Sequence, residues 1–185
     1  MRKASHGGVA RASGMPKRAA AGTLKRMTPT ERVRAALGEL GLNSEIREFA
    51  ASTSTAREAA DAVGCETGQI VKTLFFVAEG RPTVVLAAGD RQVDTGALAA
   101  LVGVGRKRLK MGTPDEVREH TGYEIGGVAP VGHLQPSDVV VDDSLKRFDC
   151  VWAAAGTGNT VFPARPEELV LAIGGQWATI TKGNA

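Results

Sequence analysis

The sequence predicts a mixed α/β fold, in which short helices surround a curved mixed β-sheet within one compact domain. Capping boxes, in which a threonine is followed three residues later by a glutamate, place helix starts at Thr28, Thr55 and Thr113. Short apolar segments of strand-like composition lie between these helices, and hairpin-like turns such as residues 79–82 join them. The elements do not repeat a βαβ unit, so we expect a mixed sheet rather than a doubly wound parallel one.

Each expected helix or strand has a local signal. The first helix carries Pro29 at its first position and ends at Gly41, a residue that readily adopts the left-handed conformation of a helix C-terminus. Further helices are expected over residues 55–63, 94–102, 113–121 and 166–173. The expected strands cover residues 46–49, 70–77, 83–88, 138–141, 150–155, 160–162 and 177–180.

Composition excludes several classes of protein. A chain of 185 residues with 43% hydrophobic and 23% charged residues has the make-up of an ordinary globular domain. Only 4% of the residues are aromatic, which argues against a base-stacking surface of the single-strand-binding kind. No apolar run approaches the roughly 18 residues of a membrane span, so no membrane partner is expected. The two cysteines lack metal-ligand spacing, and we expect a cytoplasmic protein with no metal and no cofactor.

The positive net charge belongs to the N-terminal segment. Residues 1–27 hold seven Lys or Arg and no acid, whereas the remaining 158 residues hold 16 basic and 20 acidic residues. Residues 1–27 also contain almost no large apolar side chains, so we expect a disordered basic tail followed by a domain over residues 28–182. The domain itself is mildly acidic, which argues against a general nucleic-acid-binding face.

A glycine-rich stretch, residues 122–133, is the first candidate functional segment. It holds four glycines and Pro130, which stiffens the loop by fixing one φ angle. Its central residues 126–129 could therefore turn unobstructed backbone N–H groups toward a ligand oxygen. The alternative is a plain connecting turn between two strands.

Lys72 is the most unusual charge of the chain, because it lies inside the apolar strand 69–76. A lysine in such a place must pair, extend to solvent or contact a ligand. The alternative is a lysine on the solvent face of an edge strand. A second glycine loop, residues 156–159, is explained equally well by a hairpin turn.

No arrangement of nucleophile and base is recognisable in the sequence. His133 flanks the glycine-rich stretch and could contact a substrate, whereas Asp142 and Asp143 are better explained as turn residues than as metal ligands. An ammonium and backbone donors without a nucleophile suit electrostatic catalysis on an already activated carbonyl, such as an aminoacyl ester.

Three segments together resemble the YbaK/EbsC family of aminoacyl-tRNA deacylases, which includes the editing domain inserted in bacterial prolyl-tRNA synthetases. They are Ile70 to Leu74 (IVKTL), Gly122 to Gly132 (GYEIGGVAPVG) and Gly156 to Asn159 (GTGN), and the resemblance extends over residues 28–180. It implies a trans-acting enzyme that deacylates mischarged tRNA, most simply Cys-tRNA(Pro) or another small aminoacyl-tRNA(Pro). For a cysteinyl substrate, the resemblance implies attack on the ester by the substrate's own thiol.

The resemblance also implies roles for individual residues. Lys72 would contact the terminal adenosine or the aminoacyl end, and the loop from Gly126 to Pro130 would position the ester carbonyl and the attacking water. The residues expected to be catalytic are Lys72, Gly126, Gly127 and Pro130, and those expected to bind substrate are Val128, Ala129, Gly132, His133, Gly156 and Gly158.

Four basic residues are expected to contact tRNA phosphates, namely Arg106, Lys107, Arg108 and Lys110, although a solvated basic strand explains them equally well. The expected partners are the acceptor end of a mischarged tRNA and a prolyl-tRNA synthetase. Two other classes of function stay open: a non-catalytic module that binds aminoacyl-tRNA or a synthetase, and a nucleotide-binding protein that uses the glycine loop as an anion nest.

Overall fold

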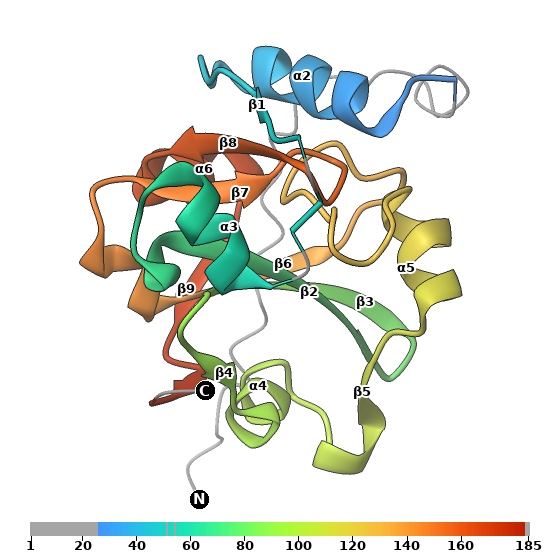
Figure 1. Cartoon of the computed structure of the whole chain (residues 1–185). Coiled ribbons are helices and arrows are strands. Elements are labelled where there is room, and N and C mark those ends of the chain that lie inside the picture. Colours follow the sequence, from blue (N-terminus) through green and yellow to red (C-terminus); the bar gives the residue numbers. More distant parts are fainter. Residues whose placement is uncertain (1–25, 51, 54, 184–185) are drawn as a thin grey trace, which may run out of the picture.

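A mixed β-sheet forms the centre of the computed structural model, which describes residues 26–50, 52–53 and 55–183 (Figure 1). Its strand order is β1-β8-β7-β2-β3-β6-β9, with β5 pairing a further part of β2. The strands are β1 (Arg47–Glu48), β2 (Ile70–Ala78), β3 (Arg81–Ala88), β5 (Leu109–Met111), β6 (Asp138–Asp142), β7 (Val151–Ala154), β8 (Thr160–Ala164) and β9 (Gln176–Ala178). Strands β4 (Gln92–Val93) and β10 (Thr181–Lys182) form a separate antiparallel pair.

The sheet is mixed, as the sequence predicts. Strands β2 and β3 form an antiparallel hairpin over eight residue pairs, and β3-β6, β6-β9 and β2-β7 pair in parallel. The short strand β5 agrees in part with the alternative of a solvated basic strand, although Arg106 to Arg108 form the 3₁₀ turn η2 instead. The strands predicted over 46–49 and 177–180 are correct in type, although β1 is only two residues long and β9 begins one residue earlier.

Five helices in the described part of the chain surround the sheet (Figure 1). They are α2 (Pro29–Glu39), α3 (Ala56–Val63), α4 (Thr95–Leu101), α5 (Pro114–Thr121) and α6 (Pro166–Ile173). The predicted capping boxes form at Thr28, Thr55 and Thr113, where the threonine hydroxyl and the glutamate each accept a backbone N–H. Short 3₁₀ turns also form, at η1 (Thr67–Gln69), η2 (Arg106–Arg108) and η3 (Asp143–Arg147).

The β2–β3 hairpin separates two apolar cores because its side chains alternate between the faces of the sheet. Val71 and Phe75 of β2 pack in the larger core beneath α2, α5 and α6, whereas Phe76 packs with α4 in a second core. The region around α3 forms a third, smaller cluster with Trp152. The site described below lies where the first and third clusters meet along β2.

Strand β2 has one edge that two different strands share. β7 pairs with its beginning, at Ile70 and Val71, and β5 pairs with its end, from Phe76 to Ala78. The Gly112 N–H extends this second pairing to the carbonyl of Phe75, at 2.9 Å. A gap in the pairing therefore remains around Thr73, between the two partner strands.

Two sequence predictions concern features outside this core. Residues 1–25, which make up most of the predicted basic tail, lie outside the described residues. Among the residues that the structure describes, no helix has the length and apolar character needed to span a membrane.

Candidate functional site

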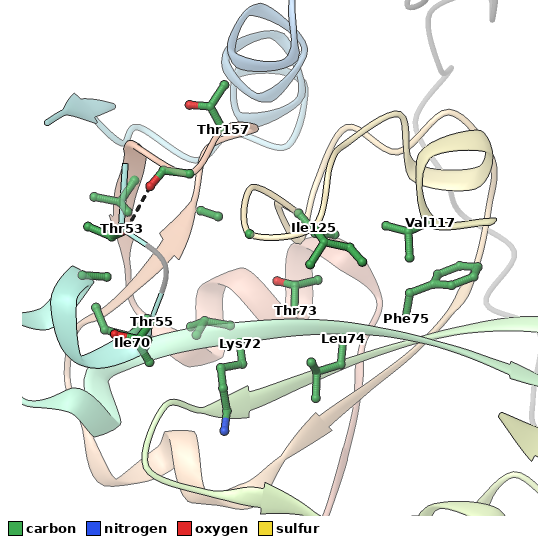
Figure 2. Close-up of a pocket in the computed structure, with 18 of the residues that line it drawn as sticks. Thr53, Thr55, Ile70, Lys72, Thr73, Leu74, Phe75, Val117, Ile125 and Thr157 are labelled. Atoms are coloured by element: carbon green, nitrogen blue, oxygen red, sulfur yellow. Dashed lines mark hydrogen bonds between the residues drawn. The ribbon is translucent and has the colours of Figure 1, made fainter. Parts of the chain in front are cut away.

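A cavity of about 320 Å³ opens at the gap along β2 (Figure 2). The N-terminal part of α3, strands β2 and β7, the β7–β8 loop, Val117 of α5 and the glycine-rich stretch all contribute to its wall. Its lining is dominated by apolar and hydroxyl side chains: Thr53, Thr55, Ala56, Ala59, Ile70, Val71, Lys72, Thr73, Leu74, Phe75, Met111, Gly112, Val117, Ile125, Gly126, Val128, Trp152, Ala154, Thr157, Gly158, Thr160 and Val161. The two glycine loops predicted from the sequence thus meet at one cavity.

Gly127 packs the two loops against each other. A Cβ atom on Gly127 would lie 2.6 Å from the Cα of Thr157, which is too close for any side chain. Glycine is therefore required here for close backbone approach rather than for an unusual φ angle. The contact places Gly126 and Val128 on the cavity wall beside Gly158.

Residues 126–128 form the tip of the glycine-rich stretch. Their backbone N–H groups differ in whether they already have a hydrogen-bond partner. The Gly127 N–H donates to the Glu124 carbonyl at 3.0 Å and closes a turn, so it does not face a ligand. Among the described residues, the N–H groups of Gly126 and Val128 form no backbone hydrogen bond. Of the predicted loop residues, these two border the cavity, so their N–H groups are the candidate donors to a ligand oxygen there.

We call residues 122–125 and 129–133 the outer part of the glycine-rich stretch. Buried side chains fix its backbone through hydrogen bonds. Arg32 is 5% exposed, donates to the Gly122 carbonyl at 2.5 Å and stacks over the Tyr123 ring. The Tyr123 hydroxyl donates toward the carbonyls of Val131 and Gly132, at 2.8 and 3.2 Å. Burial raises the pKa of Tyr123 to about 12, so the phenol stays protonated and keeps its role as a donor.

Four predicted site residues lie in this outer part and do not line the cavity: Ala129, Pro130, Gly132 and His133. The His133 ring is buried, its Nε2 lies 2.6 Å from the Ala129 carbonyl, and it packs edge-on to Tyr123. A Cβ on Gly132 would meet the Tyr123 hydroxyl at 2.6 Å. These residues pack against one another within the outer part and so stabilise the glycine-rich stretch without bordering the cavity.

In the second glycine loop, residues 156–159, one predicted site residue likewise borders the cavity and the other does not. Gly156 has φ +101° and lies against Pro29 at the start of α2, outside the cavity lining. Gly158 borders the cavity, and its carbonyl accepts both the N–H and the hydroxyl of Thr53, at 2.8 and 2.9 Å. The latter bond is drawn in Figure 2 and joins the loop to the segment before α3.

Lys72 borders the cavity, but its side chain extends from β2 away from Ile125 and Thr157 (Figure 2). The ammonium donates to the carbonyl of Arg91, beyond the end of β3. Burial lowers the pKa of Lys72, and the nearby carboxylate of Asp90 opposes that change. The structure therefore does not bring the ammonium to the glycine tip, and the predicted contact with the tRNA end stays a prediction.

Thr73 is a cavity residue that sequence reasoning missed, although it lies beside Lys72. Its side chain extends from β2 on the side of Ile125, opposite to Lys72 (Figure 2), and its buried Oγ1 has no hydrogen-bond partner in the described part of the chain. The Phe75 carbonyl points toward the shared edge of β2, and strand groups alternate in direction, so the backbone N–H and C=O of Thr73 point there too. They lie in the gap between β7 and β5.

The predicted basic cluster lies on η2 and β5, and all four of its cations are exposed. Arg108 pairs with Glu79 at 2.7 Å. Arg106 and Lys107 form no ion pair or side-chain hydrogen bond with the described residues. Strand β5 continues from this cluster into Met111 and Gly112, which border the cavity.

The described lining of the cavity holds threonine hydroxyls and Lys72 but no carboxylate, imidazole or thiol. Its lining contains no Cys, His, Asp or Glu, and no group of residues that could hold a metal ion occurs in the described part of the chain. The polar groups that border the cavity include backbone donors, threonine hydroxyls and the free edge of β2. Such a set can orient a carbonyl and stabilise negative charge on its oxygen, but it needs an external nucleophile.

Comparison with known families agrees with the resemblance stated from the motifs. Residues 50–171 match the aminoacyl-tRNA editing domain. The uncharacterized protein YwhH of Bacillus subtilis is 37% identical over 127 residues, which cover 68% of this chain and 79% of YwhH. EbsC of Enterococcus faecalis, provisionally named a Cys-tRNA(Pro)/Cys-tRNA(Cys) deacylase, is 28% identical over 137 residues, or 72% of this chain and 82% of EbsC.

A longer protein and a solved structure are also similar to this chain. The proline–tRNA ligase of Maridesulfovibrio salexigens is 34% identical over 133 residues, which cover 70% of this chain but 22% of the ligase. A crystal structure described as a provisional trans-editing enzyme for prolyl tRNA synthetase superposes with a TM-score of 0.80 at 44% identity. That match covers 85% of this chain and 99% of the other.

Proposed function

Because the chain belongs to the family of aminoacyl-tRNA editing domains, we propose that it is a trans-acting deacylase that hydrolyses the ester of mischarged tRNA, with Cys-tRNA(Pro) or another small aminoacyl-tRNA(Pro) as substrate. One observation carries this proposal. The N–H groups of Gly126 and Val128, which have no hydrogen-bond partner among the described residues, and the free edge of β2 border the same cavity, whose described lining holds no Cys, His, Asp or Glu.

The two loop N–H groups would act on the ester carbonyl. As a nucleophile adds, negative charge develops on the carbonyl oxygen, and preorganised donors near it lower the barrier. Gly126 and Val128 are suited to this because the Gly127–Thr157 contact fixes their positions. Removing one such donor in other hydrolases costs about 10²–10³ in kcat, so this loop would supply a large part of the rate.

Thr73 would orient the aminoacyl group. Its backbone carbonyl can accept a hydrogen bond from the substrate α-ammonium, while its N–H and hydroxyl can serve oxygen atoms of the ester or ribose. The nucleophile would be water or, for a cysteinyl group, the substrate thiol. In the latter case the sulfur bonds to the carbonyl carbon, the bond to the ribose oxygen breaks, and that oxygen takes the proton that the thiol gives up, which leaves free tRNA and a cyclic thioester of cysteine.

Substrate choice would follow from cavity size. The wall near the tip consists of apolar and threonine side chains, and the volume of about 320 Å³ suits a small aminoacyl group with part of the terminal ribose. One methylene changes binding by only about 1–3 kcal/mol, so a synthetase cannot reject a smaller amino acid by affinity alone. A separate hydrolytic cavity corrects such errors. The partners in this proposal are the tRNA acceptor end and a prolyl-tRNA synthetase, in the cytoplasm.

A deacylation screen tests the proposal. The purified chain at micromolar concentration is incubated with Cys-tRNA(Pro), Ala-tRNA(Pro) and the correctly charged Pro-tRNA(Pro), and the remaining ester is measured over time. We expect faster loss of the cysteinyl or alanyl ester and no acceleration for the prolyl ester. Loss of every ester at the rate seen without protein would contradict the enzymatic proposal.

Lys72→Ala tests the role that the resemblance gives to the lysine. For a direct contact, the ammonium must leave the Arg91 carbonyl, which its flexible four-carbon stem allows. We expect the variant to lose most of its deacylation rate while remaining folded by circular dichroism. Equal rates for the variant and the unmodified chain would show that Lys72 is not required.

The described lining holds no carboxylate, imidazole or thiol, and this also suits a second function, a non-catalytic module that binds aminoacyl-tRNA or a synthetase. The same screen separates the two. Salt-dependent binding of tRNA without turnover of any ester would favour the module.

A further inference from the structure

The mouth of the cavity carries two large apolar side chains that the fold leaves in solvent. Met111 is 62% exposed and Ile125 is 64% exposed, and both border the cavity. In the described part of the chain, the other exposed large apolar residues are Leu101 and Leu171, which lie outside the cavity lining. Exposed apolar side chains gathered at a cavity mouth indicate a contact surface.

The segment that leads to Met111 is basic. Residues 106–110 carry four cations and no acid, and all four cations are exposed. Strand β5 rises about 3.3 Å per residue, so Arg108 at the end of η2 lies about 10 Å from Met111. Positive charge therefore extends to Lys110, the residue before Met111; Glu79 pairs with Arg108, which leaves Arg106 and Lys107 as the cations without an ion pair among the described residues.

The opposite side of the cavity has the reverse charge. Residues 45–66, which contain β1 and α3, carry two arginines against five acidic residues: Glu45, Glu48, Glu58, Asp61 and Glu66. A polyanion that approaches the cavity is attracted along the β5 side and repelled on the α3 side. The two sides thus define a direction of approach.

We propose that the single-stranded 3′ end of an RNA reaches the cavity along residues 106–111, and that its terminal base packs on Met111 and Ile125. This inference rests on the proposed function, and it adds a direction and a base-binding surface to it. The cations contact backbone phosphates, which any sequence presents. The two apolar side chains contact the face of the base, and this replaces the aromatic platform that the composition excludes.

Equilibrium binding tests the direction of approach. Uncharged tRNA with a fluorophore at its 5′ end is titrated with the double variant Arg106→Gln/Lys107→Gln and with a matched control, Arg34→Gln/Arg57→Gln, whose side chains are also exposed. We expect the first variant to bind about tenfold more weakly at low salt. Its slope of log affinity against log salt should fall by about 1.4, at about 0.7 for each lost contact to single-stranded RNA. The control should stay within twofold of the unmodified chain, and equal effects of both variants would overturn the proposal.

A double-mutant cycle tests the base-binding surface. Met111→Ala is compared with Leu171→Ala, a truncation of a still more exposed apolar side chain outside the cavity lining, using full-length tRNA and tRNA that lacks its terminal nucleotide. We expect Met111→Ala to weaken binding of the full-length tRNA about fivefold and to have no effect on the shortened one. An equal loss for both RNAs, or no loss for either, would show that Met111 does not contact the terminal base.

These readouts separate this inference from the proposed function. If the binding results are as expected but no ester is hydrolysed, then the hydrolase proposal fails and the route stands. If mischarged tRNA is hydrolysed while Arg106→Gln/Lys107→Gln changes neither the affinity nor the KM, then the route fails and the hydrolase proposal stands.

Discussion

The glycine-rich stretch from Gly122 to His133 contains two parts that look alike in sequence and differ in their surroundings. In the outer part, Gly122 and Gly132 lie against Arg32 and Tyr123, whose side chains hold the backbone through carbonyl hydrogen bonds. At the tip, Gly126 and Val128 border the cavity and keep their N–H groups available within the described part of the chain. The comparison shows that buried side chains fix the outer part, and under the proposed function the tip would act on the substrate.

Gly127 packs the tip against the β7–β8 loop, so its substitution should have the largest effect. A methyl group in Gly127→Ala would collide with the Thr157 backbone and push the tip away from the β7–β8 loop. We expect more than a hundredfold loss of deacylation, together with about 1–3 kcal/mol of lost stability from overpacking. Initial rates on mischarged tRNA and urea unfolding measure the two effects.

Gly105→Ala is the matched control, because a Cβ at Gly105 meets no atom within 4 Å. It should leave the rate unchanged. If Gly127→Ala were as active as this control, the position of the tip would not matter for function.

Thr73→Val should have the next largest effect on activity. The Thr73 Oγ1 is buried without a partner in the described residues, so replacing it by a methyl group of similar size removes no protein hydrogen bond. We expect the free energy of unfolding to stay the same or to rise slightly, while the deacylation rate falls about tenfold, the equivalent of one hydrogen bond of about 1.4 kcal/mol. An unchanged rate would show that the Thr73 hydroxyl does not contribute to deacylation, and only the backbone groups of Thr73 would then remain as candidates.

Tyr123→Phe should change stability more than activity, because Tyr123 supports the outer part. Its loss leaves the Val131 and Gly132 carbonyls without this buried donor, which should cost about 1–3 kcal/mol at pH 7. We expect deacylation by the folded variant to remain within about threefold of the unmodified chain. A collapse of the rate without a loss of stability would contradict the division of the loop.

The pH dependence of stability gives this substitution a second signature. The pKa of Tyr123 is raised from 10.0 to about 12 in the folded chain, so the unfolded chain loses the phenol proton first. The stabilisation from the neutral phenol is complete below pH 10 and is lost as the pH rises to about 12, a change of roughly 2–3 kcal/mol. Unfolding measured at pH 9 to 12 should show this decline in the unmodified chain, and the decline should be smaller by that amount in Tyr123→Phe.

The sequence could predict those features that depend on neighbouring residues. The capping boxes at Thr28, Thr55 and Thr113 form as expected, because each requires only a threonine and a glutamate three residues apart. The mixed sheet also forms as expected, whereas the two glycine loops are far apart in sequence and only the family resemblance linked them. Local hydrogen bonding and short loops determine such features.

Other features depend on contacts between distant residues and were not visible in the sequence. Strand β5 is only three residues long, and its pairing with β2 joins residues more than 30 positions apart. The free edge at Thr73 exists because β7 and β5 end on either side of it, which no local pattern encodes. The direction of the Lys72 side chain likewise follows from the alternation along β2 and from the position of the Arg91 carbonyl.

The most direct test of the central claim is a crystal structure with a stable analogue, in which an amide replaces the ester of an aminoacyl adenosine. The account predicts that the carbonyl oxygen lies about 2.7–3.1 Å from the N–H of Gly126 or Val128, with the aminoacyl group beside Thr73. An analogue bound on the opposite side of β2, next to the Lys72 ammonium and away from the glycine tip, would contradict the account.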